Sequence, residues 1–533
     1  MSGQSKRTLA ADRKPVAAES PSLHSAGTES SVAVRSDTPA SPVLGTAFRW
    51  ILGILAALHL VIAVVFIVNQ VGHREIMSCS DAWHMGYFLQ FSEGGHCYYP
   101  KNDCWHLTDG YTPLSSEIFG WTIRAFGPDI RAVRAVAALF GVLGMVLVGA
   151  CVHRLSGSRY FAFVAAGLAA ALEPRWFIDA GPNTIHATFS ILALWLLLRD
   201  PDCSWRTVVL AGLALFASFW SKQLGLAYMT AGVVAVGARD WKKGAALAAG
   251  LAILSVAGIA YWSSQEGSQF RYWVFEMNQN QPIVWSRLWD VVFAEILTRK
   301  YAILVALSVA GIVARLRSWR DLFRPEWLFL GASGVAGCFA NCKYGSGTSQ
   351  MWVFYMVLIV LGVEAAHRFF RSRGLAAALL VPLLGVQSLA FLEDPRPYMI
   401  NSEDVARYQR VMGILSTPGK TAYYINAGFM SRLAGQPLYP QAGEDSWVKG
   451  RFDRSSLSAE RRAYLASAPW DLVIINIPLE DNSYALYEML DKSYHPLYEI
   501  PATEKNSNIY DLRYRKIVFA KGRDPNTPPV FGR

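Results

Sequence analysis

A carboxylate beside an apolar run is the first group in this sequence that could do chemistry. Asp81 lies in the stretch CSDAWHMGYFLQFSEGGHCYYP (residues 79–100), shortly after a long apolar run and among Trp, His and Tyr side chains. A carboxylate can take a proton from a hydroxyl group, and an ionisable residue this close to a membrane segment is a functional candidate. Taken alone, Asp81 is better explained as an ordinary acid of an interfacial loop, so its interpretation depends on the residues around it.

The composition is that of a membrane protein. Of the 533 residues, 53% are hydrophobic and only 17% are charged, whereas a soluble domain of this length carries about a quarter charged residues. The apolar residues gather in runs that recur from residues 48–68 to Phe391. Each run is close to the roughly 20 residues that cross a bilayer as a helix. The sequence therefore predicts an α-helical protein that spans the membrane many times.

The positive charge of the chain sets its orientation and indicates no nucleic-acid partner. The net charge is +10, but the Lys and Arg residues are scattered between apolar runs and form no single basic face. They gather in alternate loops, which the positive-inside rule places in the cytoplasm. These basic regions are the N-terminal tail and the loops 154–159, 199–206, 239–243, 315–324 and 368–373.

We predict eleven membrane-spanning helices. Their approximate bounds are 47–69, 131–152, 160–178, 183–198, 207–220, 223–238, 244–262, 301–316, 326–342, 350–366 and 374–391. The apolar stretch 113–126 is short, and counting it as a crossing would turn every later basic loop outward, so we expect it to lie in the outer interface. The first loop (70–130) and the C-terminal part then face outward, and the polar features gather on that side.

The sequence divides into three regions. Residues 1–45 are rich in Ser, Ala and Pro and predict a disordered cytoplasmic tail. Residues 46–391 form the membrane domain. In residues 392–533, TAYYIN and WDLVIINIP are typical of buried strands, and EDVARYQRVMGIL and SSLSAERRAYLAS are typical of helices. We expect a small α/β domain outside the membrane, which serves in packing or in docking an acceptor.

The order of motifs resembles a known family. Asp81 is followed by Tyr87, Gly95, Pro113 with Leu114, Gly127 and Arg134. This order is similar to that of the GT-C membrane glycosyltransferases, particularly the protein O-mannosyltransferase and lipid A aminoarabinose transferase branch. The stretches AALEPRWFIDAGPNTIHATFSILALWLLLR and LAGLALFASFWSKQLGL resemble later family segments. The resemblance covers roughly residues 47–390.

Two departures from the family pattern concern substrate contacts. Related aminoarabinose transferases carry a Lys before the Pro-Leu motif, where this chain has Tyr111 and Thr112. Many relatives also carry an acid at the second outer turn, where the best match here is Asn183, with Asp179 four residues earlier.

The resemblance implies a function and a set of residue roles. The chain is expected to move a sugar from a polyprenyl-phosphate donor to an acceptor hydroxyl at the outer membrane face, with Asp81 as the base. The positive charge that offsets the departing phosphate is assigned first to Lys222. A snorkelling anchor is an equally good explanation of Lys222. Arg271 and Lys343 are weaker candidates, for which an ordinary loop cation is the preferred explanation.

A second group of residues is expected to contact the substrate weakly. His84 follows Asp81 by three residues, and this spacing puts both on one helix face. Aromatic side chains such as Tyr87 can stack on a sugar or a prenyl chain, although aromatic residues are enriched at membrane interfaces in any case. The weak substrate-binding residues are His84, Tyr87, Tyr111, Asp179 and Asn183.

The sequence requires no cofactor. Seven cysteines are present, and Cys79, Cys97 and Cys104 lie in the same outer loop. If that compartment is oxidising, a bridge such as Cys97–Cys104 is one possible pairing, and the sequence does not fix it. With His96 and His106, Cys97 and Cys104 could instead bind zinc, but the spacing fits no standard pattern, so a divalent metal is not favoured. A lipid-linked donor needs neither ATP nor a nucleotide sugar at this face.

Three other functions remain open at this point. Within the enzymes, the runner-up is a lipid-to-lipid transferase of another phosphate-linked group. A transporter or flippase of lipid-linked saccharides would place polar residues at mid-membrane within internal repeats, and neither is found in this sequence. A non-catalytic scaffold of the cell envelope is the third alternative. Under every alternative, we expect a multi-pass protein of the inner membrane with a cytoplasmic N-terminus. If the chain is the glycosyltransferase, its acceptor is a protein, a lipid or a polysaccharide. The sequence does not identify the sugar.

Overall fold

The structure is a computed structural model of the chain. It describes residues 42–75, 79–94, 96–99, 110–172, 178–297, 300–343, 348–371, 375–424, 427–437, 470–477, 494–501 and 515–522. Side chains are described throughout these ranges except at 42–45, 79–83, 295, 348 and 375–381. All of these residues belong to one compact unit, 40–533.

Each of the eleven predicted apolar segments corresponds to a helix. These helices are α1 (Pro42–Gly72), α4 (Ile130–Ser156), α5 (Arg159–Ala170), α6 (Pro182–Arg199), α7 (Trp205–Ser221), α8 (Gly225–Gly237), α9 (Trp241–Glu266), α13 (Ala302–Arg315), α14 (Pro325–Asn341), α15 (Trp352–Arg371) and α16 (Leu375–Ala390). Among the described residues, four segments are long and apolar enough to cross a membrane: Thr46–Gly72, Ile130–Ser156, Trp241–Glu266 and Ser349–Arg371. The chain is an integral membrane protein, and the number of crossings stays a prediction.

Local sequence signals set the ends of these helices. The side chains of Asp129, Ser204 and Asp240 accept hydrogen bonds from the first turns of α4, α7 and α9, which satisfies backbone donors that have no partner within the helix. Gly157 ends α4 with a left-handed backbone, φ 70°, a conformation that glycine adopts without steric cost. Polar caps at the ends of apolar runs therefore define where each helix begins and ends.

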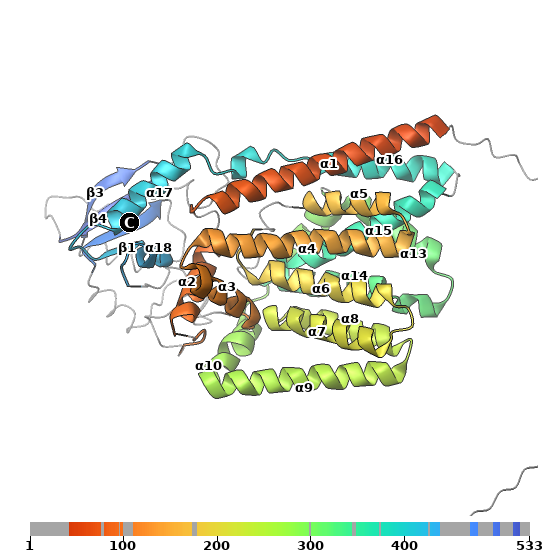
Figure 1. Ribbon diagram of the computed structural model, residues 1–533, viewed down its shortest axis with the longest axis horizontal. Helices are drawn as coiled ribbons and strands as arrows, with labels where there is room; N and C mark the ends of the chain where they lie inside the picture. Colours follow the sequence, from red (N-terminus) through yellow and green to blue (C-terminus); the bar gives the residue numbers. More distant parts are fainter. Residues whose placement is uncertain are drawn as a thin grey trace, which may run out of the picture. The chain divides into compact units, whose positions relative to one another are not determined.

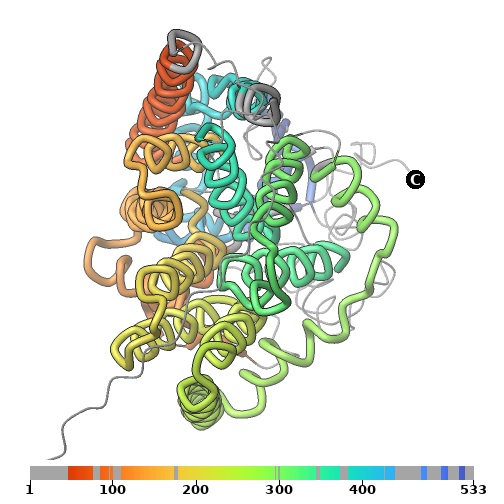
Figure 2. Tube along the Cα trace, turned by 90° about the vertical axis from the view of Figure 1, so that its right-hand side faces the viewer, coloured from red at the N-terminus to blue at the C-terminus, as the bar shows by residue number. Residues whose placement is uncertain are grey.

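The helices pack closely around α4 and α15. Figure 1 shows α4, α6, α7 and α9 side by side, and Figure 2 views many of the helices end-on. At Gly167 of α5, an added Cβ would lie 2.7 Å from the Cα of Ala56 in α1, and at Gly149 of α4 it would lie 2.8 Å from the Ala162 carbonyl oxygen. Small residues thus allow α1, α4 and α5 to approach backbone to backbone, as is usual between membrane helices.

Two short helices lie at one end of this bundle. Helix α2 (Cys79–Gly94) packs against α3 (Leu114–Phe126), and an added Cβ at Gly120 would lie 2.3 Å from the Phe91 ring. Helix α3 is the predicted helix of 113–126. It buries Phe119 and Ile123 but exposes Trp121, the amphipathic pattern expected of a helix in a membrane interface.

The loop predicted at 263–300 contains helical turns. They are α10 (Ser268–Arg271), η2 (Tyr272–Glu276), α11 (Met277–Asn280), α12 (Ser286–Trp289) and η3 (Asp290–Leu297). Segments η2 and η3 are π-helical, and π-helical turns are frequent at functional sites. Short 3₁₀ turns occur at η4 (Trp319–Phe323), η5 (Thr348–Met351) and η6 (Arg396–Tyr398).

The C-terminal part is a small α/β structure. It contains α17 (Ser402–Leu415), β1 (Ala422–Tyr424), α18 (Gly428–Leu433), β2 (Leu472–Ile477), β3 (Tyr494–Ile500) and β4 (Arg515–Lys521). The sheet order is β1-β2-β4-β3, with β1 parallel to β2 and the other pairs antiparallel. The predicted strands in TAYYIN and WDLVIINIP and the helix in EDVARYQRVMGIL are confirmed. The helix predicted in SSLSAERRAYLAS lies outside the described residues.

The C-terminal part shares an apolar core with the helices at one end of the bundle. Met85 and Phe88 of α2 belong to the same buried cluster as Phe429 and Met430 of α18 and Ile474 of β2. Figure 1 shows α2, α3, α18 and the sheet at the same end of the molecule. The position of α2, which carries Asp81, is therefore set partly by the C-terminal α/β structure.

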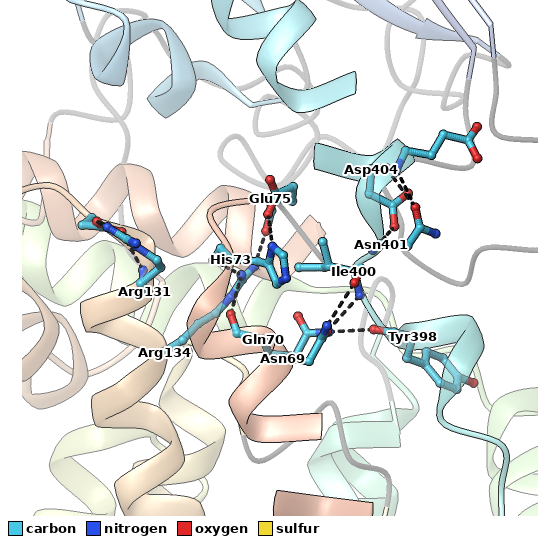
Figure 3. A network of polar contacts seen from close by, with 12 residues as sticks. Asn69, Gln70, His73, Glu75, Arg131, Arg134, Tyr398, Ile400, Asn401 and Asp404 are labelled. Atoms are coloured by element: carbon cyan, nitrogen blue, oxygen red, sulfur yellow. Dashed lines mark hydrogen bonds and ion pairs between the residues drawn. The ribbon is translucent and has the colours of Figure 1, made fainter. Parts of the chain in front are cut away.

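Polar contacts at the end of α1 tie the same two regions together. The Asn69 side chain donates to the Ile400 carbonyl (3.0 Å) and accepts from the Ile400 amide (2.9 Å), and Gln70 donates to the Tyr398 carbonyl (2.7 Å) (Figure 3). Arg134, one of the predicted motif residues, is fully buried and donates to the backbone carbonyls of residues 70, 73 and 75. Arg134 thus closes the C-terminal end of α1.

Candidate functional site

Several predicted site residues lie together where α6, α7, α2 and the first loop meet. The ammonium group of Lys222 donates a hydrogen bond to Asn183 Oδ1 and lies 5.4 Å from the centre of the Tyr111 ring. The rings of His84 and Tyr111 have centroids 6.0 Å apart. Asp179 acts on Lys222 electrostatically. Residues from four separate stretches of the sequence therefore form one cluster around a buried lysine.

Lys222 is held by the turn between α7 and α8. It caps α7 in an extended conformation, and its amide donates to the Ser218 carbonyl. The residue is only 4% exposed. Burial lowers the pKa of Lys222 to about 7, while Asp179 acts in the opposite direction. Lys222 forms no ion pair with the carboxylates of the described residues, so its contacts there are an amide, an aromatic ring and a longer-range charge.

His84 packs between this cluster and the core of α2. It stacks on Phe88, with centroids 6.0 Å apart, and meets Tyr87 edge-on at 6.1 Å. Burial, with a smaller contribution from the Lys222 charge, lowers the pKa of His84 to about 3. His84 is therefore neutral at physiological pH. Tyr87 is buried in the core that α2 shares with α18.

Gly181 allows His84 to reach the turn before α6. An added Cβ at Gly181 would lie 2.9 Å from His84 Cε1 and 3.5 Å from Asp179 Oδ2. The backbone of Gly181 is extended, so the restriction comes from the imidazole ring and not from the backbone conformation. This close approach places α2 directly beside Asp179 and Asn183.

Lys343 connects to the cluster through other residues. Its ammonium donates to the Asn278 carbonyl (2.6 Å), and the Asn278 side chain donates to the Gly110 carbonyl (3.0 Å). The Gln223 side chain also donates to Gly110 (2.8 Å) and to the Val274 carbonyl (2.8 Å). Burial lowers the pKa of Lys343. The network fixes the backbone just before Tyr111 and brings the end of α14 close to it.

Gln223, Asn278 and Gly181 are parts of the site that the sequence analysis missed. Gln223 directly follows Lys222, which is a weak signal for it. No spacing marks Asn278, because its side chain donates to the Gly110 carbonyl, which is distant in the sequence. Gly181 lies in the quoted stretch between Asp179 and Asn183, but only the structure shows the ring that excludes a side chain there.

Arg271 does not join this cluster. It lies exposed on α10 and makes no hydrogen bond or ion pair with the described residues. Its place in an outer loop was the reason for proposing it, but that place says nothing about the direction of the side chain. The described contacts therefore do not place Arg271 beside Lys222, and its role as a phosphate contact stays a prediction.

Asp81 is placed only by its backbone. It lies in the first turn of α2, one turn before His84, and its side chain lies outside the described residues. The α2 backbone brings residue 81 to the same end of the bundle as Lys222. Its assignment as the base stays a prediction.

The cysteines give no metal centre among the described residues. Those residues contain no group of three His, Cys, Asp or Glu side chains that could hold a metal. Cys97 is buried, and its suggested partner Cys104 lies outside the described residues, so the bridge between them stays a prediction. His96 contacts Glu266 at 3.2 Å. Cys104 and His106 lie outside the described residues, which leaves the alternative of a zinc site a prediction.

Comparison with solved structures identifies the fold. ArnT from Cupriavidus metallidurans in the apo state matches with a TM-score of 0.54 at 16% identity, over 87% of this chain and 97% of that chain. The same protein bound to undecaprenyl phosphate matches with a TM-score of 0.52 at 15% identity over the same shares. The Archaeoglobus fulgidus oligosaccharyltransferase is less similar, with a TM-score of 0.45 at 12% identity over 82% of this chain and 69% of that chain.

The likeness to ArnT shows a GT-C fold for this chain. ArnT is a lipid A aminoarabinose transferase, from the branch that the motif order resembles, so the predicted resemblance is confirmed at the level of the fold. No protein-family model matches the chain, and no curated protein matches its sequence.

Proposed function

We propose that this protein is a glycosyltransferase that moves a sugar from a polyprenyl-phosphate donor to an acceptor hydroxyl. The observation that carries the proposal is the buried Lys222, held by Asn183 and Tyr111 at the end of a GT-C bundle. A buried charge is unfavourable unless it is paired, and the described residues give Lys222 no ion pair. A phosphate that reaches this lysine would supply the opposite charge.

The donor class follows from the place of this lysine. Lys222 lies in a turn at the ends of two apolar helices, where the head group of a lipid can be reached while its chain stays in the bilayer. ArnT, which has the same fold, has been crystallised with undecaprenyl phosphate. Both points support a polyprenyl-phosphate sugar as the donor over a soluble nucleotide sugar.

The proposed reaction needs one base and one cation. The acceptor oxygen forms a bond with the anomeric carbon of the sugar, and the bond from that carbon to the phosphate oxygen breaks. The proton of the hydroxyl goes to Asp81, and the polyprenyl phosphate leaves with its negative charge next to Lys222. Because phosphate is a competent leaving group, a second carboxylate to protonate it, as in glycosidases, is not required.

The neighbours of Lys222 receive supporting roles in this proposal. Asn183 orients the ammonium group through its hydrogen bond. Tyr111 and the neutral His84 offer ring faces that can contact the sugar. Lys343 acts at a distance, because its ammonium is bonded to the Asn278 carbonyl, and we assign it to the entry of the phosphate.

The orientation of the chain completes the proposal. The basic loops place the starts of α5, α7, α9 and α14 in the cytoplasm, so Lys222 and Lys343 lie at the outer face of the inner membrane. The C-terminal α/β structure then lies outside, where it packs against α2. All eleven apolar helices cross the membrane in this arrangement.

The experiment that tests this function uses purified protein in vesicles with a panel of radiolabelled polyprenyl-phosphate sugars and membrane extract. We expect label to move covalently to an acceptor with the native chain and not with Lys222→Met. Lys300→Met is the matched control, because Lys300 forms an ion pair with Glu393 away from the site (2.5 Å). Label that crosses the bilayer without covalent transfer would favour the transporter. If label is neither transferred nor moved across the bilayer, the scaffold is favoured.

A further inference from the structure

A row of polar side chains continues from Lys222 into the interface between α6 and α7. Asn183, His186 and Ser190 lie on one face of α6, because they are spaced by three and four residues. They meet Lys222 and Ser218, which are four residues apart at the end of α7. His186 Nδ1 lies 2.9 Å from Ser218 Oγ, and the Ser190 and Ser218 hydroxyls are 2.8 Å apart. The function proposed above uses only the Lys222 and Asn183 end of this row.

The hydrogen bonds of this row fix which nitrogen of His186 carries the proton. Ser190 donates its single hydroxyl proton to the His186 carbonyl (2.9 Å), so the proton between the two serines comes from Ser218. The Ser218 oxygen then has no proton left for the imidazole, and Nδ1 must donate to it. Nδ1 is also 3.2 Å from the Ser218 carbonyl, which can only accept. His186 is therefore protonated at Nδ1, and its Nε2 is an acceptor.

Two polar atoms at this point have no hydrogen-bond partner among the described residues. One is the acceptor Nε2 of His186, and the other is the hydroxyl of Tyr228 on α8. His186 is 3% exposed and Tyr228 is fully buried. The two rings have centroids 5.3 Å apart, and the Lys222 charge acts electrostatically on His186. An acceptor and a hydroxyl thus belong to two neighbouring buried rings, and His186 feels the charge of the Lys222 ammonium group.

We propose that His186 and Tyr228 hold one buried water molecule beside Lys222, and that this water positions the lysine for the donor phosphate. The water donates to His186 Nε2, accepts from the Tyr228 hydroxyl and accepts from a second proton of the ammonium group. Three partners are typical of a buried water. An ammonium group has three donors, and Asn183 uses one, so the water fixes a second and leaves the third for the phosphate.

The water site itself is tested without any enzymatic activity. Protein labelled with ¹⁵N-histidine is measured in vesicles by solid-state NMR. The His186 signals are assigned as those that disappear in the His186→Gln variant. We expect the Nδ1-protonated neutral form and magnetisation transfer from water to Nε2, which Tyr228→Phe abolishes. A proton on Nε2, or a native Nε2 without contact to water, would overturn the proposal. Ser190→Ala is a second variant, and it should allow the other tautomer to form.

The positioning role rests on the proposed function and is tested separately with undecaprenyl phosphate as the probe. Tyr228→Phe should weaken its binding about fivefold, which corresponds to one hydrogen bond of ordinary net strength. Tyr160→Phe is the matched control, because it removes a hydroxyl that donates to the Arg49 carbonyl at the start of α1. Unchanged binding in Tyr228→Phe, with the NMR contact to water present in the native chain, would disprove the positioning role. If the native protein shows no glycosyl transfer, the proposed function fails, but the NMR test of the water site is unaffected.

Discussion

Two buried cations near opposite ends of α14 have very different surroundings. Arg315 contacts Glu326 in the first turn of α14 at 2.5 Å and Glu364 of α15 at 3.5 Å, and Arg368 pairs with Glu364 at 2.7 Å. Lys222, in contrast, belongs to the cluster that Lys343, just past the end of α14, joins through Asn278 and Gly110. The described residues give Lys222 amide and ring contacts in place of ion pairs.

The difference separates a cation that holds helices together from one that can hold a ligand. The charge of Arg315 is already balanced by two carboxylates, so a further anion gains little there. The buried ammonium of Lys222 is not balanced in this way, and a bound phosphate improves its electrostatic situation. Burial alone thus does not indicate a site. The useful sign is a buried charge whose opposite charge is left for a ligand.

The largest effect is expected from the balanced cation. Arg315→Met leaves Glu326 and Glu364 buried without their shared partner, and such a loss costs about 3–5 kcal/mol. The measurement is a denaturant titration of the detergent-solubilised protein. Arg396→Met is the matched control, because its pair with Asp394 is exposed and exposed pairs contribute about 0–1 kcal/mol. If both variants lose equal stability, the ion pairs of Arg315 with Glu326 and Glu364 have no special role.

Removing the charge of Lys222 should affect turnover more than stability. Lys222→Met replaces a buried charged side chain with a neutral one of similar length. The free energy of unfolding should therefore be unchanged or slightly higher. Sugar transfer should fall about 10²–10³-fold, as when one group that stabilises a developing negative charge is removed. Steady-state transfer assays and the same denaturant titration measure the two quantities. A variant that transfers normally, or that unfolds as easily as Arg315→Met, would remove the distinction between the two cations.

The binding of the lipid phosphate should depend on pH through Lys222. Its pKa is lowered to about 7 by burial, so the free protein loses the charge as the pH rises above 7. The affinity for undecaprenyl phosphate should then fall by up to about tenfold per pH unit. His84, with its pKa lowered to about 3, contributes nothing in this range. Binding titrations from pH 6 to pH 9 measure the effect.

Lys222→Arg provides the control for this pH dependence. Arginine stays charged over the whole range, so its affinity should follow only the titration of the lipid phosphate, which both proteins share. The difference between the two curves isolates the lysine. Parallel curves would mean that Lys222 does not titrate near pH 7 or does not meet the phosphate.

The helices could be predicted from the sequence, and most of their surroundings could not. Apolar runs and capping residues determine helices such as α4 and α7, because burial and backbone hydrogen bonding act locally. Strand β3 was missed because its residues are half exposed and include Pro496, so no alternation stands out. The π-helical η2 was missed because its conformation depends on distant contacts, such as the one from Trp273 to the Tyr99 carbonyl.

The candidate site was predicted only in outline. Topology alone placed Asp179, Asn183 and Lys222 at the same membrane face, and the structure brings them together. The same argument admitted Arg271, because topology selects a face and not a side-chain direction. Asn278 and Gln223 could not be found in this way, because a side chain that binds distant carbonyls leaves no pattern in the sequence.

The smallest effect tests how tightly the end of the bundle near Lys222 is built. Gly181→Ala would push a methyl group against His84, because an added Cβ would lie only 2.9 Å from His84 Cε1. Such overpacking costs about 1–3 kcal/mol. Because His84 belongs to α2, the displacement should also reduce sugar transfer beyond the loss of folded protein. Gly250→Ala is the matched control, since nothing lies within 4 Å of its added Cβ. Denaturant titration and transfer per folded molecule separate the two effects. If Gly181→Ala behaves like Gly250→Ala, the docking of α2 against the turn before α6 does not organise the surroundings of Lys222, and the contrast with Arg315 concerns charge alone.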